Sequence, residues 1–229
     1  MDALVRTART TGLFYLGLAI TGMFGFLLIR PKLFVADDAA STLANLVAHS
    51  SLARVGVAFE LGIVVTQALL AIWFYRLFRT IDAVAAGSIA AFGLVNAVAI
   101  LGSAAMLGSA VTVAHEPVGD AAATVQLLYL ISGNLWTAGN LFFGLWLVPM
   151  GLCVLRSRWM PRPLGWVLVA GGVGYVLAGF ATYLFPGVPA IAEVLTVPAT
   201  VGEFWMIGYL LIRGVRRTAT ASPEALPAT

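Results

Sequence analysis

Residues 86–113 read AGSIAAFGLVNAVAILGSAAMLGSAVTV, a stretch that contains no charged side chain. A helix needs about 20 mainly apolar residues to cross the hydrocarbon core of a bilayer, which is about 30 Å thick. The stretch is longer than this, and an apolar run of that length is typical of a transmembrane helix. We therefore expect residues 86–113 to span a membrane.

Five further stretches have the same character. Of the 229 residues, 61% are hydrophobic and 10% are charged, and the mean hydropathy is +0.97. This composition excludes an ordinary soluble enzyme and gives no reason to expect a nucleic-acid partner. The predicted spans cover about residues 11–29, 53–74, 86–113, 123–155, 164–185 and 191–212. The sequence thus predicts an all-α protein, with a single six-helix transmembrane domain over residues 1–217 that contacts membrane lipids, and a disordered cytoplasmic tail at 218–229.

The segment after the first span contains the sequence Arg30-Pro-Lys32, which we expect to end that span. Asp37 and Asp38 follow, and apolar residues then recur at helical spacing. Acidic residues favour the start of a helix. The sequence therefore predicts a short interfacial helix over residues 38–49.

The basic residues predict the topology. Ten of the 13 Lys and Arg residues lie on one side of the six spans: Arg6, Arg9, Arg76, Arg79, Arg156, Arg158, Arg162, Arg213, Arg216 and Arg217. The other side has Arg30, Lys32 and Arg54. The positive-inside rule then places both termini in the cytoplasm. The excess of arginine over lysine suggests a bacterial source, so we expect a multi-pass protein of the bacterial cytoplasmic (inner) membrane.

Two acidic residues lie inside predicted spans, Glu60 in the second and Glu203 in the sixth. An ionisable group at such a position is costly and is usually functional. A carboxyl in apolar surroundings is more stable in its neutral form, so we predict Glu60 and Glu203 to be catalytic general acids in one enclosed pocket in the outer half of the bundle. The alternative is that each glutamate bonds a neighbouring polar group and only stabilises the bundle.

Amides and aromatic rings accompany the two acids. Gln67 follows Glu60 by seven residues and shares its helix face. On the fourth span, aromatic, glycine and amide residues recur at spacings of 4, 3, 4 and 3, which places them on one face: Tyr129, Gly133, Trp136, Asn140 and Phe143. Amides in lipid must point into the bundle. The predicted substrate-binding residues are Tyr15, Gln67, Asn96, Tyr129, Trp136, Asn140, Tyr175 and Tyr183.

Residues suited to other chemistries are few. His49 and His115 both fall in predicted loops, and Cys153 is the one cysteine. No Walker loop, dinucleotide fingerprint or His-Glu-x-x-His pattern occurs in the sequence. We therefore expect no metal site and no cofactor.

Several motifs resemble those of a known family. They are Phe143–Gly151 (FGLWLVPMG), Arg156–Gly165 (RSRWMPRPLG), Gly171–Tyr175 (GGVGY), Pro198–Glu203 (PATVGE) and Gly208–Gly214 (GYLLIRG). Together with Gly12–Tyr15 and Ser51–Glu60, they resemble a bacterial family of six-span membrane proteins known only as a domain of unknown function. The resemblance covers nearly the whole chain and implies a six-helix membrane fold.

A looser similarity concerns mechanism. Small integral-membrane terpene cyclases also place two acidic residues on different spans beside an aromatic pocket. That similarity implies an acid-initiated cyclase or isomerase that forms terpenoids and uses no metal. Such an enzyme, classed as an isomerase or a lyase, would act on an isoprenoid-like apolar substrate. Protonation needs a carboxylic acid, and carbocations are stabilised by aromatic faces. Two alternatives are a proton-coupled transporter, with Pro198 marking a broken sixth helix, and a non-catalytic structural subunit.

Overall fold

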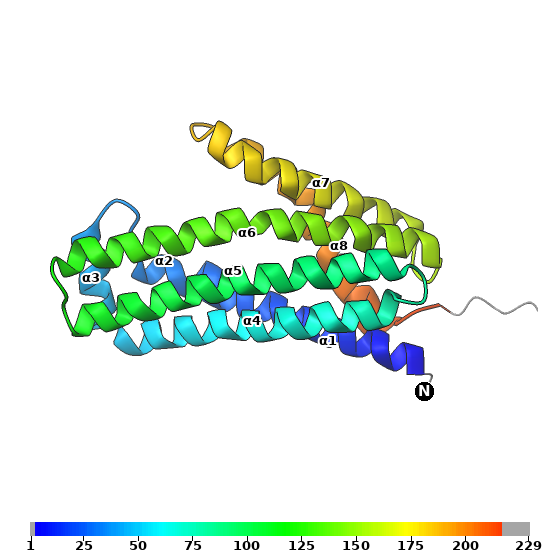
Figure 1. Cartoon of the computed structure of the whole chain (residues 1–229), viewed down its shortest axis with the longest axis horizontal. Coiled ribbons are helices and arrows are strands. Elements are labelled where there is room, and N and C mark those ends of the chain that lie inside the picture. The colour runs from blue at the N-terminus through cyan, green and yellow to red at the C-terminus, as the bar shows by residue number, and fades with distance from the viewer. Residues whose placement is uncertain (1–2, 217–229) are drawn as a thin grey trace, which may run out of the picture.

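The computed structural model describes residues 3–216, and these form helices without any strand. Six helical segments are long and apolar enough to cross a membrane, which confirms the predicted all-α, six-span fold (Figure 1). They are Ala3–Leu33, α4 (Ser50–Phe78), α5 (Ala83–His115), α6 (Ala121–Ser157), α7 (Arg162–Leu184) and α8 (Pro189–Ile212). The tail predicted to be disordered, 218–229, lies outside the described residues.

The spanning helices form a ring. Each packs against the next one along the chain, and α8 returns to pack against the first span. Both ends of the described chain lie at the same end of the bundle, which we call the terminal end (Figure 1). The opposite end has the short helix α3 (Ala39–Ala48), and we call it the α3 end.

The first span is longer than predicted and is not a uniform α-helix. It consists of α1 (Ala3–Gly22), a π-helix η1 (Met23–Ile29) and a final turn α2 (Arg30–Leu33). The sequence analysis placed its end before Arg30, whereas the structure continues the helix past it. Proline is tolerated in the first turn of a helix, and Pro31 occupies such a position in α2. A π-helix inside an α-helix often marks a functional site.

The predicted interfacial helix is present as α3. The Asp38 carboxylate caps its start by accepting hydrogen bonds from the backbone N–H and the hydroxyl of Ser41, at 2.8 and 2.6 Å. These bonds favour the charged carboxylate and lower the pKa of Asp38. The helix packs on the ends of α5 and α6 and so covers the α3 end of the bundle.

Glycines allow α6 and α7 to approach very closely. An ideal Cβ built on Gly144 would lie 2.6 Å from the carbonyl oxygen of Gly172, and one built on Gly172 would lie 2.7 Å from that of Gly144. The pair Gly151 and Gly165 makes a second contact of this kind. Small residues at a helix crossing are the usual means of close packing in membranes.

We expect Gly172→Ala to lower the thermal unfolding midpoint of the detergent-solubilised protein. The added methyl group must push α6 and α7 apart, and overpacking of this kind costs about 1–3 kcal/mol. For a chain of this size, each kcal/mol corresponds to about 2–4 °C. Gly179→Ala on the same helix is the control, because its added Cβ has open space among the described residues. Equal midpoints for the two variants would contradict the close contact.

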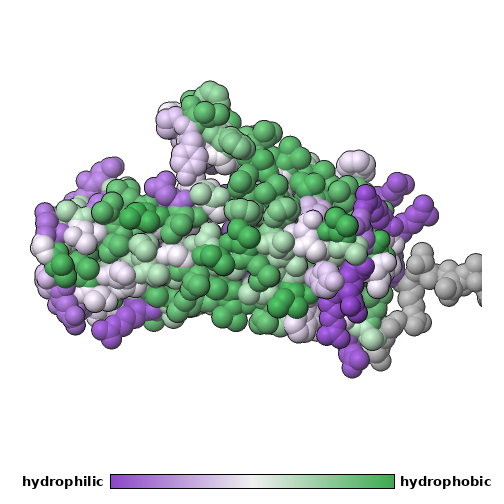
Figure 2. All heavy atoms as spheres, in the orientation of Figure 1, coloured by the Kyte–Doolittle hydropathy of each residue, from purple (hydrophilic) through white to green (hydrophobic). Residues whose placement is uncertain are grey.

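The surface matches a protein that crosses a membrane. Figure 2 shows an apolar belt between two polar ends, with a hollow beneath the projecting lobe at the top. The lobe is the end of the α7–α8 hairpin that lies toward the α3 end, where α7 diverges from α6 (Figure 1). At the terminal end α8 stays close to α1, because Leu210 and Leu211 lie against Gly12. The first span and α8 thus separate toward the α3 end.

Candidate functional site

A cleft of about 1010 Å³ lies where the helices separate, between the first span, α6, α7 and α8. This volume is at the upper end of the range of about 300–1,000 Å³ for ligand sites. Most of the lining is apolar, and the aromatic side chains in it are Tyr15, Phe26, Tyr129, Trp136, Phe143, Tyr175 and Phe204. The cleft therefore has the size and the largely apolar lining of a site for an apolar molecule.

Glu203 and Tyr15 form a hydrogen-bonded pair in the cleft wall. The Tyr15 hydroxyl donates to Glu203 Oε1 over 2.6 Å. Tyr15 is buried, and its ring packs edge-on against Phe74 and Trp146, with centroid distances of 5.6 and 5.7 Å. Glu203 is half-buried and lines the cleft. The aromatic packing fixes Tyr15, and Tyr15 in turn orients the carboxyl group.

The orientation of Glu203 determines which oxygen can act on a bound molecule. Since Oε1 accepts the bond from Tyr15, a neutral Glu203 has its proton on Oε2. Glu203 lies 14 residues after the start of α8 at Pro189, or about 21 Å along the helix, well inside the apolar belt. A carboxyl held in this way can donate a proton to a molecule in the cleft and can take one back.

Glu60 belongs to a different structure, a buried network around Arg30. Glu60 Oε1 accepts from Arg30 Nη1 at 3.1 Å and from Trp136 Nε1 at 3.4 Å. Glu60 Oε2 accepts from the Ser103 hydroxyl at 2.8 Å, and Ser103 lies 2.7 Å from the hydroxyl of Ser132. Glu60 is 1% exposed and Arg30 is 7% exposed. An ion pair this deeply buried is tolerated only when it is well hydrogen-bonded.

The two glutamates do not share a pocket. Arg30 and Trp136 line the cleft, and Glu60 lies behind them. Tyr15 contacts Glu203, and Arg30 contacts Glu60. These two residues are 15 positions apart on the first span, or about 20 Å along its axis. The sequence analysis expected one pocket with two acids, whereas the structure gives the cleft a single carboxyl, that of Glu203. Glu203 lies near the middle of α8.

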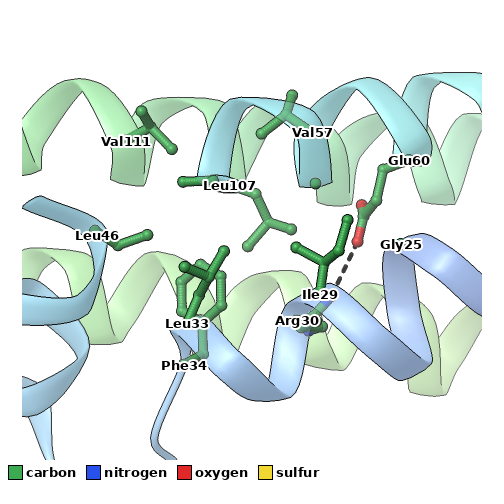
Figure 3. Close-up of a pocket in the computed structure, with 12 residues that line it drawn as sticks. Gly25, Ile29, Arg30, Leu33, Phe34, Leu46, Val57, Glu60, Leu107 and Val111 are labelled. Carbon is green, nitrogen blue, oxygen red and sulfur yellow. Dashed lines mark hydrogen bonds and ion pairs between the residues drawn. The ribbon is translucent and has the colours of Figure 1, made fainter. Parts of the chain in front are cut away.

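A separate small cavity lies on the other side of the ion pair. Figure 3 shows the Glu60 carboxyl at one edge of it, joined to Arg30, with apolar side chains such as Leu33, Leu46 and Leu107 around the remainder. Its volume of about 10 Å³ is close to the space that one water molecule needs. It has no room for a substrate, so the 1010 Å³ cleft is the candidate site.

The predicted substrate-binding residues fall into three groups. Those that line the cleft are Tyr15, Tyr129, Trp136, Asn140 and Tyr175. Gln67 and Asn96 are instead buried within the bundle, and no protein group among the described residues hydrogen-bonds their amides. Tyr183 lies near the end of α7 and is 55% exposed, on the outside of the bundle.

Arg30 is the charged residue of the cleft wall that the sequence analysis missed. It had been assigned to a loop because it comes before Pro31 and Lys32. A signal for its position existed in the sequence, because Arg30 follows Phe26 by four residues, a spacing that places the two side chains on one helix face. The guanidinium carbon lies 5.4 Å from the centroid of the Phe26 ring and 5.0 Å from that of Tyr129, which shields its charge from lipid.

Within residues 3–216, no group of three or more His, Cys, Asp or Glu side chains is arranged to hold a metal ion. The sixth span is one helix through Pro198, without the break that the transporter alternative anticipated.

Comparison with known proteins identifies the family. No curated protein and no solved structure is detectably similar to the chain. A family described as Domain of unknown function (DUF4386) matches residues 10–214, which include all six spans in whole or in large part. This multi-pass membrane protein therefore belongs to the DUF4386 family.

Proposed function

We propose that the protein is a membrane enzyme that isomerises or cyclises an isoprenoid-like apolar substrate in the cleft, with Glu203 as the general acid. The observation that supports this best is a carboxyl oriented by Tyr15 in the wall of a large aromatic cleft. We further propose that it works in the bacterial inner membrane with its termini in the cytoplasm. The concentration of arginines at the terminal end, in the loops after α4 and α6, supports that orientation.

The proposed chemistry needs only the substrate and Glu203. Oε2 of neutral Glu203 donates its proton to a carbon–carbon double bond or an epoxide oxygen, and a carbocation forms. Aromatic faces such as those of Trp136 and Tyr175 stabilise the positive charge. The carboxylate of Glu203, held by Tyr15, then removes a proton from a carbon next to the cation, and a new double bond forms. The product is an isomer of the substrate, and the acid is regenerated.

Product analysis tests this proposal. The full chain, purified with native lipids, is incubated with linear prenyl alcohols and their epoxides, and the products are analysed by mass spectrometry. We expect new compounds with the mass of the substrate but a different retention time. Absence of conversion, together with proton-dependent uptake of a prenyl compound into vesicles, would replace the enzyme by a transporter. Absence of both activities would favour a structural subunit.

Tyr15→Phe is expected to lower the turnover rate about tenfold while leaving substrate affinity nearly unchanged. The ring and its packing against Phe74 and Trp146 remain, but the hydrogen bond that orients Glu203 is lost. The rate constant and the Michaelis constant from the product assay distinguish the two effects. A change confined to affinity would show that Tyr15 only shapes the cleft.

A further inference from the structure

Arg30 lies between the buried ion pair and the cleft. Nη1 donates to Glu60, whereas an ideal Cβ on the cleft residue Gly133 would lie 3.7 Å from Nη2. Among the described residues, Glu60 is the one hydrogen-bond acceptor that contacts the guanidinium group. Phe26 and Tyr129 lie against the guanidinium group. The Nη2 edge is therefore available to an oxygen atom of a molecule in the cleft.

The charges at this end of the cleft are balanced. Arg30 is the one cationic residue among the described residues that line the cleft, and Glu60 neutralises it. An anionic group placed beside Arg30 would thus be buried without a compensating charge, which is costly in a medium of low dielectric constant. A neutral oxygen accepts the hydrogen bond without adding charge.

We infer that the cleft selects neutral prenyl compounds with a terminal oxygen atom, such as alcohols, over prenyl carboxylates and diphosphates, and that Arg30 Nη2 donates to that oxygen. The inference rests on the proposed function for the kind of molecule in the cleft and adds the class of its polar group. A chain held at Arg30 extends along the first span toward Tyr15 and Glu203, and positions 30 and 15 are about 20 Å apart along the helix axis. Arg30 is a binding residue in this arrangement, at the opposite end of the cleft from the acid.

Competition binding tests the inference without requiring turnover. Radiolabelled geranylgeraniol is bound to the full chain in nanodiscs of neutral lipid and displaced by unlabelled geranylgeraniol, geranylgeranoic acid or geranylgeranyl diphosphate. We expect the alcohol to compete at a concentration at least about tenfold lower than either anion, because the anions must be buried beside an Arg30 whose charge is already neutralised.

Two variants separate the charge from the hydrogen bond. Glu60→Gln leaves Arg30 unpaired, so the carboxylate should gain affinity by about tenfold or more and approach or pass the alcohol. Arg30→Met/Glu60→Gln removes both charges and the donor, and the alcohol should lose about tenfold in affinity. The matched control is Arg156→Met/Asp82→Asn, which removes the ion pair at the terminal end and should bind all three ligands like the wild type.

Several results would overturn the inference. They are failure to bind the alcohol, equal or tighter binding of the diphosphate by the wild type, and unchanged alcohol affinity in Arg30→Met/Glu60→Gln. Binding to the wild type and to Arg30→Met/Glu60→Gln decides the question even if Glu60→Gln does not fold. Binding with the expected preference but without conversion would refute the proposed enzyme and leave the ligand class intact.

Discussion

Glu203→Gln is expected to reduce product formation by about 10²–10⁴-fold, the range usual for loss of a general acid. The amide keeps the size of the side chain and can still accept the hydrogen bond of Tyr15, so the cleft should keep its shape. It cannot donate a proton to an alkene at a useful rate. The measurement is the initial rate of product formation by mass spectrometry at saturating substrate.

The control for this variant lies on the same helix. Glu193 is exposed near the start of α8, so Glu193→Gln makes the same chemical change away from the cleft and should retain the wild-type rate. Binding of the prenyl alcohol should be nearly equal in the two variants, because the acid is remote from Arg30. Turnover by Glu203→Gln within tenfold of the wild type would exclude Glu203 as the proton donor.

The fold follows from the sequence because a bilayer leaves few alternatives. Apolar stretches such as 86–113 must be helices that satisfy their own backbone hydrogen bonds. Because there are six of them, the described chain begins and ends at the same end of the bundle. Helix periodicity was also informative inside the spans. The five-residue stripe that begins at Tyr129 and ends at Phe143 lines the cleft in the structure, since amides and rings on one face point away from lipid.

The partners of the two acids were not predictable in the same way. A sequence shows that Glu60 and Glu203 are costly in a membrane, but it does not show which distant side chain offsets that cost. The partner of Glu60 is 30 positions away and that of Glu203 is 188 positions away. Arg30, the partner of Glu60, was not predicted to lie inside the span because a proline and a lysine follow it. Those residues normally signal the end of a span, and here the chain continues for one more helical turn.

The two acids therefore differ in what their surroundings allow. Glu60 accepts hydrogen bonds at both oxygens, from Arg30, Trp136 and Ser103, so a proton on it would displace a donor. Glu203 accepts one hydrogen bond, from the Tyr15 hydroxyl, and it lines the cleft. We accordingly assign the chemistry to Glu203 alone and the organisation of the first span to the Arg30–Glu60 pair.

If the Arg30–Glu60 pair organises the first span, substitution of Glu60 should have a large effect on stability. Glu60→Gln should lower the free energy of unfolding by about 3–5 kcal/mol, because removing one partner of a buried ion pair leaves the other charge uncompensated. Arginine does not lose its proton under ordinary conditions, so Arg30 cannot escape the cost by becoming neutral. The free energy is measured by SDS titration in mixed micelles, with tryptophan fluorescence as the signal.

The double variant distinguishes a charge effect from a loss of packing. Arg30→Met/Glu60→Gln removes both charges, keeps an acceptor for the hydroxyl of Ser103, and should recover most of the stability lost in Glu60→Gln. Arg156→Met/Asp82→Asn should cost less than about 1 kcal/mol, because that ion pair is partly exposed at the terminal end. If the double variant were less stable than Glu60→Gln, the pair would stabilise the bundle through its contacts rather than through compensation of charge. Glu60 would then be a packing residue, and the neutral character inferred for the cleft would lose its physical basis.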